Sequence, residues 1–149
     1  MTDLTVADIL IVEDNPADAR LAKEAFLEQG SGHILHHVKD GVEAMEFLRG
    51  EGRFATSPTP DIVLLDLNLP RKNGHEVLAE IKSDPNLLRT PVIVLTTSKA
   101  ERDIMRSYDL HANCYIIKPL DVDEYINVVR SVERFWLCNI ALAPKRRKA

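Results

Sequence analysis

The sequence is poor in cysteine, because its 149 residues include only Cys114 and Cys138. Two cysteines fit neither a disulfide framework nor a metal knuckle, so we expect reduced thiols in a cytoplasmic protein. The neighbouring histidines His33, His36 and His37 lack a cysteine or acid to complete a zinc set, and are expected to be surface or core residues. The chain also lacks a Gly/Ser- or Pro-rich linker, a signal-peptide pattern and an apolar stretch long enough to span a bilayer. These absences predict one soluble domain.

An excess of positive charge is missing as well. The formal net charge of −4 gives no general case for nucleic-acid binding. The basic run KRRK at 145–148 could contact nucleic acid or acidic partners, but a short terminal run is more often a solvated tail. We therefore predict a single domain over residues 1–143 and a disordered basic tail over 144–149. Neither a GxxxxGKS/T loop nor GxGxxG occurs, which disfavours a nucleotide enzyme.

What the sequence does contain is five short apolar runs. They have strand length, are rich in isoleucine and valine, and occupy residues 8–12, 33–38, 61–65, 90–95 and 113–118. Each run precedes a segment whose apolar residues recur with helical spacing. This alternation predicts a doubly wound α/β domain with a five-stranded parallel sheet, because parallel neighbours need helical crossovers. The flavodoxin-like strand order 2-1-3-4-5 with five helices suits a chain of this size.

Short polar residues mark the start of each predicted helix. Each stands three residues before an acid, as in a capping box, where the two side chains satisfy free backbone N–H groups. The five pairs are Asn15 with Asp18, Asp40 with Glu43, Asn73 with Glu76, Ser98 with Glu101, and Asp121 with Glu124. One such pair is weak evidence, whereas five pairs, each just after an apolar run, strongly support the alternation.

Five polar residues at the strand ends are not needed for capping. They are Glu13 and Asp14 after the first strand, Asp66 after the third, Thr96 at the end of the fourth and Lys118 at the end of the fifth. Ligands of such sheets bind at the carboxyl ends of the strands. Crowded carboxylates repel one another unless a cation is present, and oxygen ligands suit Mg²⁺. A cation, a lysine and a hydroxyl around Asp66 would bind a phosphoryl group, with Asp66 as the nucleophile.

Each of these residues also has an ordinary structural interpretation. Glu13 and Asp14 could be solvated turn acids, Thr96 could simply end a strand, and Lys118 could belong to an ordinary turn. Asp66 is different, because a carboxylate directly after a fully apolar run is costly without a partner. The joint occurrence of all five residues at strand ends favours the functional interpretation.

Four segments resemble the motifs of response-regulator receiver domains, and the likeness spans residues 8–138. They are VEDN with Glu13 and Asp14, DLNLPRKNG at 66–74, LTTS with Thr96, and CYIIKP with Tyr115 and Lys118. The resemblance implies that Asp66 accepts a phosphoryl group from a phosphohistidine of a sensor histidine kinase, in a two-component phosphorelay. It also implies that Lys118 pairs with the phosphoryl oxygens, and that Thr96 and Tyr115 are the switch residues.

The same resemblance implies a Mg²⁺ site. The ion would be held by Asp14, by Asp66, by the backbone carbonyl of Asn68, and by Glu13 through water. The Lys118–Pro119 peptide is expected to be cis, which an X-Pro bond allows at low cost.

Longer segments narrow the resemblance. Among them, VEDNPADARLAKEAF and LHANCYIIKPLD are similar to stand-alone regulators paired with cyanobacterial phytochrome kinases. A phytochrome-type histidine kinase is therefore the expected partner. Thr97 departs from the family pattern, in which Ala or Gly usually follows the residue that corresponds to Thr96. A bulkier side chain there is expected to slow the attack of water on the phosphorylated protein.

No output domain is expected after the fifth helix, so the signal would pass through a phosphorylation-dependent protein–protein interface. In the last predicted helix, the spacing of the apolar residues predicts a stripe that faces the core, which consists of Tyr125, Val128, Val129, Val132 and Phe135. The apolar residues beyond it favour a homodimer through the fourth helix, fifth strand and fifth helix, with folding back on the same domain as the alternative. The residues assigned to the dimer interface are Tyr108, Tyr115, Phe135, Trp136 and Ile140.

Two other classes of protein remain as alternatives. A Mg²⁺-dependent phosphohydrolase would need a second acid near its nucleophile, and Asn68 is a poor proton shuttle. A phosphorylation-independent interaction module would not need the full set of Asp14, Asp66, Thr96 and Lys118. Both classes are therefore disfavoured against a phosphoacceptor signalling protein.

Overall fold

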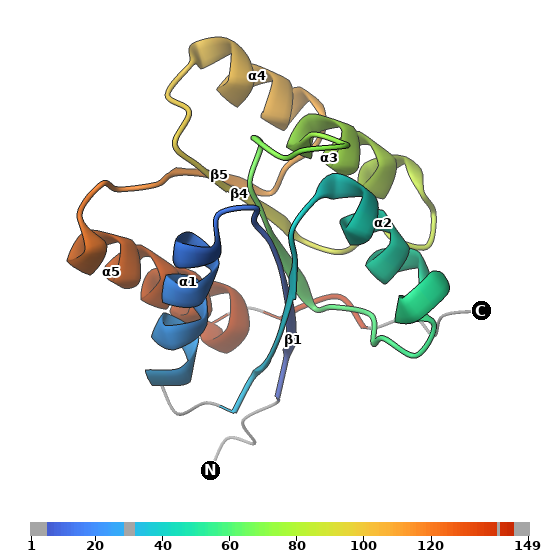
Figure 1. The fold of residues 1–149 in the computed structure, drawn as a ribbon, viewed down its shortest axis with the longest axis horizontal. Helices are drawn as coiled ribbons and strands as arrows, with labels where there is room; N and C mark the ends of the chain where they lie inside the picture. The colour runs from blue at the N-terminus through green and yellow to red at the C-terminus, as the bar shows by residue number, and fades with distance from the viewer. Residues whose placement is uncertain (1–5, 29–31, 140, 145–149) are drawn as a thin grey trace.

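Five parallel strands form one central sheet in the computed structural model, which describes residues 6–28, 32–139 and 141–144 (Figure 1). The strands are β1 (Asp8–Val12), β2 (Ile34–Val38), β3 (Ile62–Leu65), β4 (Val92–Thr96) and β5 (Cys114–Ile117). Their order is β2-β1-β3-β4-β5, and all neighbouring pairs are parallel. The predicted fold class and strand order are confirmed. The strand order reverses beside β1 and β3, so their carboxyl ends flank the expected ligand-binding crevice.

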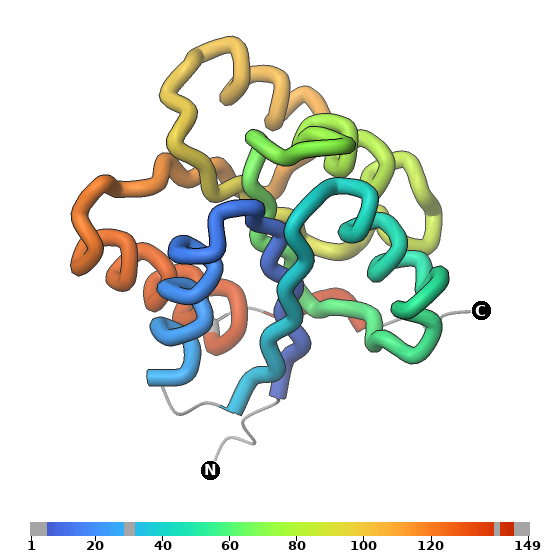
Figure 2. Tube along the Cα trace, viewed as in Figure 1, coloured from blue at the N-terminus to red at the C-terminus, as the bar shows by residue number. Residues whose placement is uncertain are grey.

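Helices cover both faces of this sheet (Figures 1 and 2). They are α1 (Pro16–Glu28), α2 (Gly41–Arg49), α3 (Gly74–Ser83), α4 (Glu101–Asp109) and α5 (Val122–Glu133), with a 3₁₀ helix η1 (Gly52–Phe54) and a π-helical turn η2 (Arg134–Asn139). Helices α1 and α5 pack together on one face, α2 and α3 pack on the other, and α4 contacts β5 at the sheet edge. Within the described residues, the helices are too short or too polar to cross a membrane.

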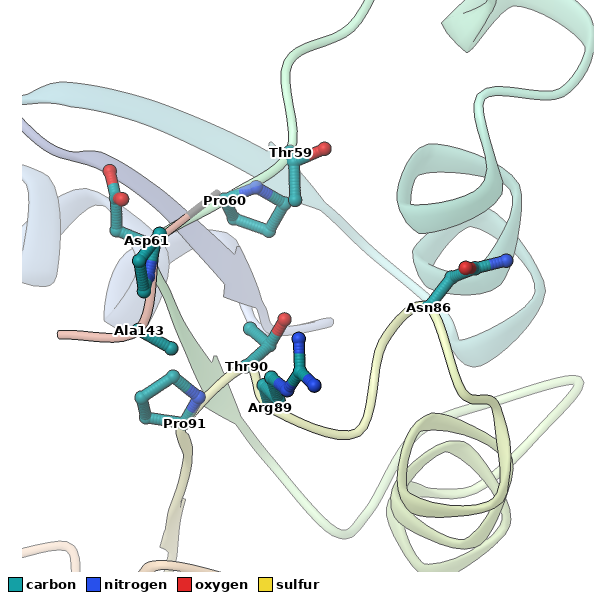
Figure 3. Close-up of a pocket in the computed structure, with 9 residues that line it drawn as sticks. Thr59, Pro60, Asp61, Asn86, Arg89, Thr90, Pro91 and Ala143 are labelled. Atoms are coloured by element: carbon teal, nitrogen blue, oxygen red, sulfur yellow. The ribbon is translucent and has the colours of Figure 1, made fainter. Parts of the chain in front are cut away.

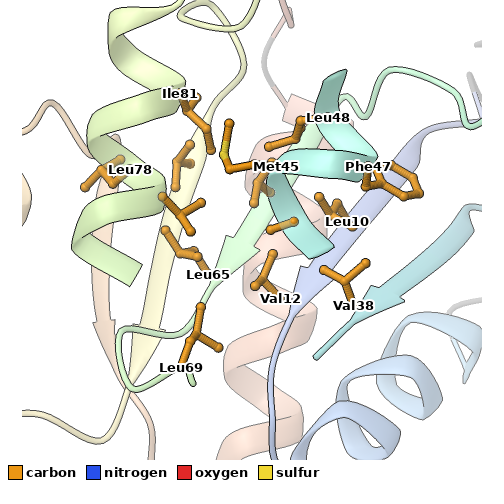
Figure 4. Packing of buried hydrophobic residues seen from close by; sticks show 14 of the residues in the cluster. Leu10, Val12, Val38, Met45, Phe47, Leu48, Leu65, Leu69, Leu78 and Ile81 are labelled. Carbon is orange, nitrogen blue, oxygen red and sulfur yellow. The ribbon is translucent and has the colours of Figure 1, made fainter. Parts of the chain in front are cut away.

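Two hydrophobic clusters fill the space between the sheet and its helices. Every residue of β3 is buried: Ile62 and Leu64 face the cluster under α1 and α5, whereas Val63 and Leu65 face the one under α2 and α3 (Figure 4). A central parallel strand is covered on both faces, so its sequence is an unbroken apolar run. Asp66 is therefore a buried polar residue directly after a fully buried strand.

Four of the five predicted helix caps are confirmed. The side chains that accept a hydrogen bond from the backbone N–H three residues on are those of Asn15, Asp40, Asn73 and Asp121. The prediction for Ser98 is wrong, because α4 begins at Glu101, after Ala100. The Ser98 hydroxyl instead donates to Asp103 Oδ2 at 2.6 Å and accepts from the Ala100 N–H at 3.3 Å. It orders the loop before α4 rather than the first turn of the helix.

The end of α5 differs from its prediction because the helix changes its hydrogen-bonding pattern. Val129 and Val132 are buried as expected, whereas Phe135, predicted to face the core, is 52% exposed. Residues of η2 follow π-helical i→i+5 bonding, which puts more residues in each turn than an α-helix does. The apolar stripe therefore passes to Trp136 and Leu137, which pack against the cluster under α1 and α5. These two residues fold back on their own domain, as the alternative to the dimer contact predicted.

The last described residues lie at the edge of the sheet where the strands begin. Ala143 and Pro144 line a small pocket together with residues 59–61, which lead into β3, and residues 89–91, which lead into β4 (Figure 3). This edge is opposite to the one where Asp66 lies. Ile140 and the basic run at 145–148 fall outside the described residues.

Candidate functional site

Three carboxylates meet at the carboxyl ends of β1 and β3. Glu13 and Asp14 follow β1, and Asp66 follows β3, which is paired with β1 in the sheet. One carboxylate oxygen from each residue lies within 4.8 Å of the others. Glu13 and Asp66 are buried, whereas Asp14 is exposed. The structure thus brings the three predicted acids together in a cluster that solvent reaches at Asp14.

Lys118 compensates part of the charge of this acidic cluster. It follows β5, and its Nζ donates hydrogen bonds to Glu13 Oε1, to Asp66 Oδ2 at 3.1 Å and to Asp18 Oδ2 at 3.1 Å. The Lys118 side chain is buried together with Glu13 and Asp66. Sequence reasoning missed Asp18 as a site residue, because its place in the first turn of α1 identifies it as the acid of a capping box.

Burial and neighbouring charges shift the pKa values of two of these groups. Burial raises the pKa of the Glu13 carboxyl to about 7, against the opposing hydrogen bond from Lys118 and with a further rise caused by Asp66. Burial by itself would lower the pKa of Lys118, but the hydrogen bond to Glu13 and the charge of Asp66 raise that pKa above its ordinary value. Lys118 is therefore charged at neutral pH. A divalent cation placed among the carboxylates would lower the pKa of Glu13 again.

The donor set of the acidic cluster fits a hard divalent cation. Mg²⁺ prefers oxygen ligands, takes one or two carboxylates and keeps several waters, which an exposed ligand such as Asp14 permits. The Asn68 N–H donates to Asp66 Oδ1 at 3.2 Å, so one oxygen of Asp66 is held by the backbone and the other contacts Lys118. Glu13, Asp14 and Asp66 could hold the cation, and the Asn68 carbonyl stays a predicted ligand.

The loop between β3 and α3 packs tightly against the backbone of Asp66. A Cβ on Gly74 would lie 2.4 Å from the Asp66 carbonyl oxygen and 2.6 Å from Leu67 Cα, so only glycine permits this approach. The Gly74 N–H donates to the Leu67 carbonyl at 2.9 Å. Farther along the loop, Arg71 adopts a positive φ of 66° and its Nη1 donates to Asp40 Oδ2 at 3.2 Å. The first turn of α3 and the start of α2 therefore hold the loop in place.

Thr96 and Tyr115 are brought together around the loop that follows β4. Thr96 is fully buried, and its Oγ1 accepts a 3.5 Å hydrogen bond from the Ser98 N–H. The Tyr115 hydroxyl donates to the Ser98 carbonyl at 3.0 Å. Both predicted switch residues therefore contact Ser98. The prediction of a cis Lys118–Pro119 peptide is wrong: the described residues contain no cis peptide, and trans is the intrinsically preferred form.

A buried polar network that sequence reasoning missed links α3 to α4. His75 Nε2, in the first turn of α3, lies 3.0 Å from Ser107 Oγ and 3.3 Å from the Asp103 carbonyl oxygen. Asp103 Oδ2 in turn accepts from Ser98, which contacts Tyr115. Burial lowers the pKa of His75, so the imidazole is neutral in this network at neutral pH. Sequence spacing gives no signal for contacts between separate helices.

The residues assigned to a dimer interface lie in different environments. Tyr108 on α4 and Phe135 on η2 are about half exposed. Tyr115 and Trp136 are partly buried, and Ile140 falls outside the described residues. Trp136 contacts Phe135 edge-on, with the ring centroids 5.5 Å apart. Two of the four described residues thus expose substantial side-chain surface.

A family model of the response regulator receiver domain matches residues 9–130, which include the acidic cluster and Lys118. The chain belongs to this family. Response regulator receivers are phosphoacceptor signalling proteins, so this membership confirms that prediction over the phosphohydrolase.

Known receivers resemble this chain along most of its length. Response regulator Rcp1 of Synechocystis sp. strain PCC 6803 is 48% identical over 134 residues, which are 90% of this chain and 91% of Rcp1. The crystal structure of the phosphorylated cyanobacterial phytochrome response regulator RcpA is 51% identical, with a TM-score of 0.92, and covers 94% of this chain and 100% of that one. The Mn²⁺-bound form of Rcp1 is 46% identical, with a TM-score of 0.89, over 93% of this chain and 99% of that one. The resemblance to phytochrome response regulators is thus confirmed, and the acidic cluster is a group of oxygen ligands that could hold a divalent cation.

Proposed function

We propose that this receiver works as a phosphorylation switch in which Asp66 accepts the phosphoryl group. An Asp66 carboxylate oxygen would attack the phosphorus of a phosphorylated histidine and form a P–O bond. The P–N bond would break, and its electron pair would return to the imidazole nitrogen. The observation that carries this proposal is the place of Asp66, which lies within the acidic cluster with Oδ2 3.1 Å from Lys118 Nζ.

The neighbouring residues would divide the work of binding the phosphoryl group. Asp14 and Asp66, with the Asn68 carbonyl and with Glu13 through water, would hold Mg²⁺, which neutralises part of the phosphoryl charge when bound. The Lys118 ammonium, already hydrogen-bonded to Asp66, would pair with a phosphoryl oxygen.

The switch residues would respond to that phosphoryl group. Thr96 would donate its hydroxyl to a phosphoryl oxygen, and its weak 3.5 Å contact with the Ser98 N–H is readily given up. Tyr115, anchored on the Ser98 carbonyl, would follow the movement of that loop. The change would reach α4 and β5, where partners can bind.

The phosphoryl donor we propose is a phytochrome-type histidine kinase of the cytoplasm. This proposal is supported by the identity of 51% to RcpA, whose structure is that of a phytochrome response regulator. Phosphotransfer from an autophosphorylated cyanobacterial phytochrome should exceed transfer from a sensor kinase of another class. Equal transfer from both kinases would contradict the proposed partner.

We further propose a homodimer through α4, β5 and α5 as the output of the switch. Apolar side chains are exposed along this face, with Met105 59%, Tyr108 50% and Ile117 38% exposed. Tyr108→Glu should therefore weaken dimerisation measured by light scattering after phosphorylation. Leu27→Glu is the matched control, because Leu27 is also an exposed apolar residue but lies on α1. A dimer that Leu27→Glu weakens and Tyr108→Glu does not would contradict this surface.

The phosphoacceptor is tested by intact mass after incubation with Mg²⁺ and acetyl phosphate. Wild type should gain one phosphoryl group and Asp66→Asn none. Asp109→Asn, at an exposed acid that ends α4, controls for the loss of one carboxylate and should be phosphorylated like wild type. Phosphorylation of Asp66→Asn to the wild-type extent would contradict the proposal. If wild type shows no adduct, consumption of acetyl phosphate in the same sample distinguishes fast hydrolysis from no reaction.

A further inference from the structure

Residues at the end of the edge strand β2 form hydrogen bonds with both the backbone N–H and the backbone carbonyl of Glu13. The Glu13 N–H donates to the Val38 carbonyl at 3.1 Å. On the other side, His37 Nε2 lies 2.7 Å from the Glu13 carbonyl oxygen. A carbonyl only accepts hydrogen bonds, so Nε2 carries the proton and donates it.

The hydrogen bond from His37 to the Glu13 carbonyl lies outside the backbone ladder of the sheet. The β1–β2 ladder ends with Val12 opposite Val38, so the Glu13 carbonyl lies beyond the last paired residue. A side chain here supplies the donor that strand pairing no longer provides. The bond fixes the plane of the peptide that joins Glu13 to Asp14.

The orientation of that peptide matters because the two acids are held differently. Glu13 is buried and its carboxylate is bound by Lys118 and by the Asn15 N–H. The Asp14 carboxylate is exposed, and it makes no hydrogen bond or ion pair with any described residue. Where Asp14 points therefore depends on its backbone. The three carboxylates also repel one another, which favours any backbone movement that would spread them apart.

We propose that His37 is a positioning residue of the metal site, which fixes the Glu13–Asp14 peptide so that both acids face Asp66. This inference rests on the proposed function, in which these acids hold a divalent cation. His37 contributes no ligand atom, and its effect on the cation passes through the Glu13 carbonyl. Groups that orient ligands without touching the metal commonly change metal affinity strongly when they are replaced.

The test is the affinity for Mn²⁺ alone, measured from the electron paramagnetic resonance signal of the free ion. His37→Phe keeps a ring of similar size and removes the donor, and we expect about tenfold weaker binding. His37→Gln keeps an N–H donor and should restore most of the affinity. The matched control is His36→Phe on the same strand, whose imidazole contacts Asp8 and Phe47 instead of the site, and it should bind like wild type.

Each outcome decides the proposal. Wild-type affinity in His37→Phe would overturn it, and so would a loss in His37→Gln as large as in His37→Phe, because the ring would then act by packing alone. Thermal unfolding without metal shows whether His37→Phe is folded, and if it is not, the comparison of His37→Gln with His37→Leu replaces it. Asp14→Asn distinguishes failure of the proposed metal site from failure of the positioning role of His37. Mn²⁺ binding by wild type that Asp14→Asn leaves intact would refute the proposed metal site itself, whereas loss in Asp14→Asn with none in His37→Phe would refute only the positioning role.

Discussion

Removal of one buried hydroxyl, in Ser107→Ala, should destabilise the contact between α3 and α4. Ser107 is fully buried, and its Oγ donates to the Asp103 carbonyl at 2.7 Å. A hydroxyl has one proton, so the 3.0 Å contact with His75 must use the proton on His75 Nε2, with Ser107 as the acceptor. After the substitution, the His75 N–H keeps only the longer contact to the Asp103 carbonyl, at 3.3 Å.

The size of the destabilisation in Ser107→Ala depends on the His75 N–H, which loses its nearer acceptor. A buried donor that loses its acceptor costs about 1–3 kcal/mol, and we expect about 2 kcal/mol because the Asp103 carbonyl compensates in part. In a domain of this size, such a loss lowers the Tm by about 4–8 °C. The matched control is Ser131→Ala on α5, whose exposed hydroxyl makes the same bond to the carbonyl four residues earlier and has no second partner among the residues that the structure describes. It should stay within about 0.5 kcal/mol of wild type.

The same network predicts a pH dependence. Burial lowers the pKa of His75 in the folded protein below its ordinary value of 6.5, with the nearby charge of Arg106 acting in the same direction and Asp103 against it. As the pH falls below about 6.5, the unfolded chain therefore binds a proton that the folded protein resists, and the unfolding free energy decreases. The decrease ends once the pH is below the folded-state pKa. His75→Gln keeps an N–H donor without this titration and should show a flatter pH profile.

Urea unfolding followed by circular dichroism, at about pH 7.5 and about pH 5.5, measures both effects. Equal losses of free energy in Ser107→Ala and Ser131→Ala would refute the assignment of Ser107 as a buried acceptor. A His75→Gln protein that loses as much stability between the two pH values as wild type would refute the lowered pKa.

Three further substitutions test the loops around the site. Gly74→Ala places a Cβ 2.4 Å from the Asp66 carbonyl oxygen, so we expect an unfolding free energy lower by about 1–3 kcal/mol and slower phosphorylation by acetyl phosphate; wild-type values of both would contradict the close approach. Tyr115→Phe removes the hydrogen bond to the Ser98 carbonyl and should cost about 1 kcal/mol in urea unfolding, and no change would show that the bond is dispensable. Thr97→Ala should shorten the lifetime of the phosphorylated protein, because the bulkier threonine directly after Thr96 is expected to slow the attack of water; equal decay by intact mass would refute this.

The features that depend on local sequence were predictable. A short, fully apolar run rich in β-branched residues, such as β3, is typical of a strand covered on both faces, and the alternation with helices then limits the sheet to few strand orders. The caps formed by Asn73 and Asp121 could be predicted because a capping contact spans only three residues. The acids and Lys118 were found by the same reasoning, since residues that end neighbouring parallel strands meet at one edge.

The features that were missed depend on contacts between distant segments, on competition between local hydrogen-bond partners, or on a change of helix type. Lys118 and Asp18 are 100 positions apart, and no periodicity indicates that their side chains meet. Ser98 has the spacing of a cap, but the position of Asp103 gives its hydroxyl a stronger partner. Phe135 was placed in the core by α-helical spacing, and the π-helical turn shifts that spacing at its own position.

The two ends of the described chain lie at the edge of the sheet where the strands begin, which is opposite to the edge that carries the carboxylates. Ala7 immediately precedes β1, and Ala143 lies beside the residues that lead into β3 and β4. The five residues of β1, at about 3.3 Å each, separate this edge from the acidic cluster by about 16 Å. A protein immobilised through residues near either end of the described chain would present its acidic cluster to the solution, so a kinase or a metal ion could be titrated without obstruction by the support.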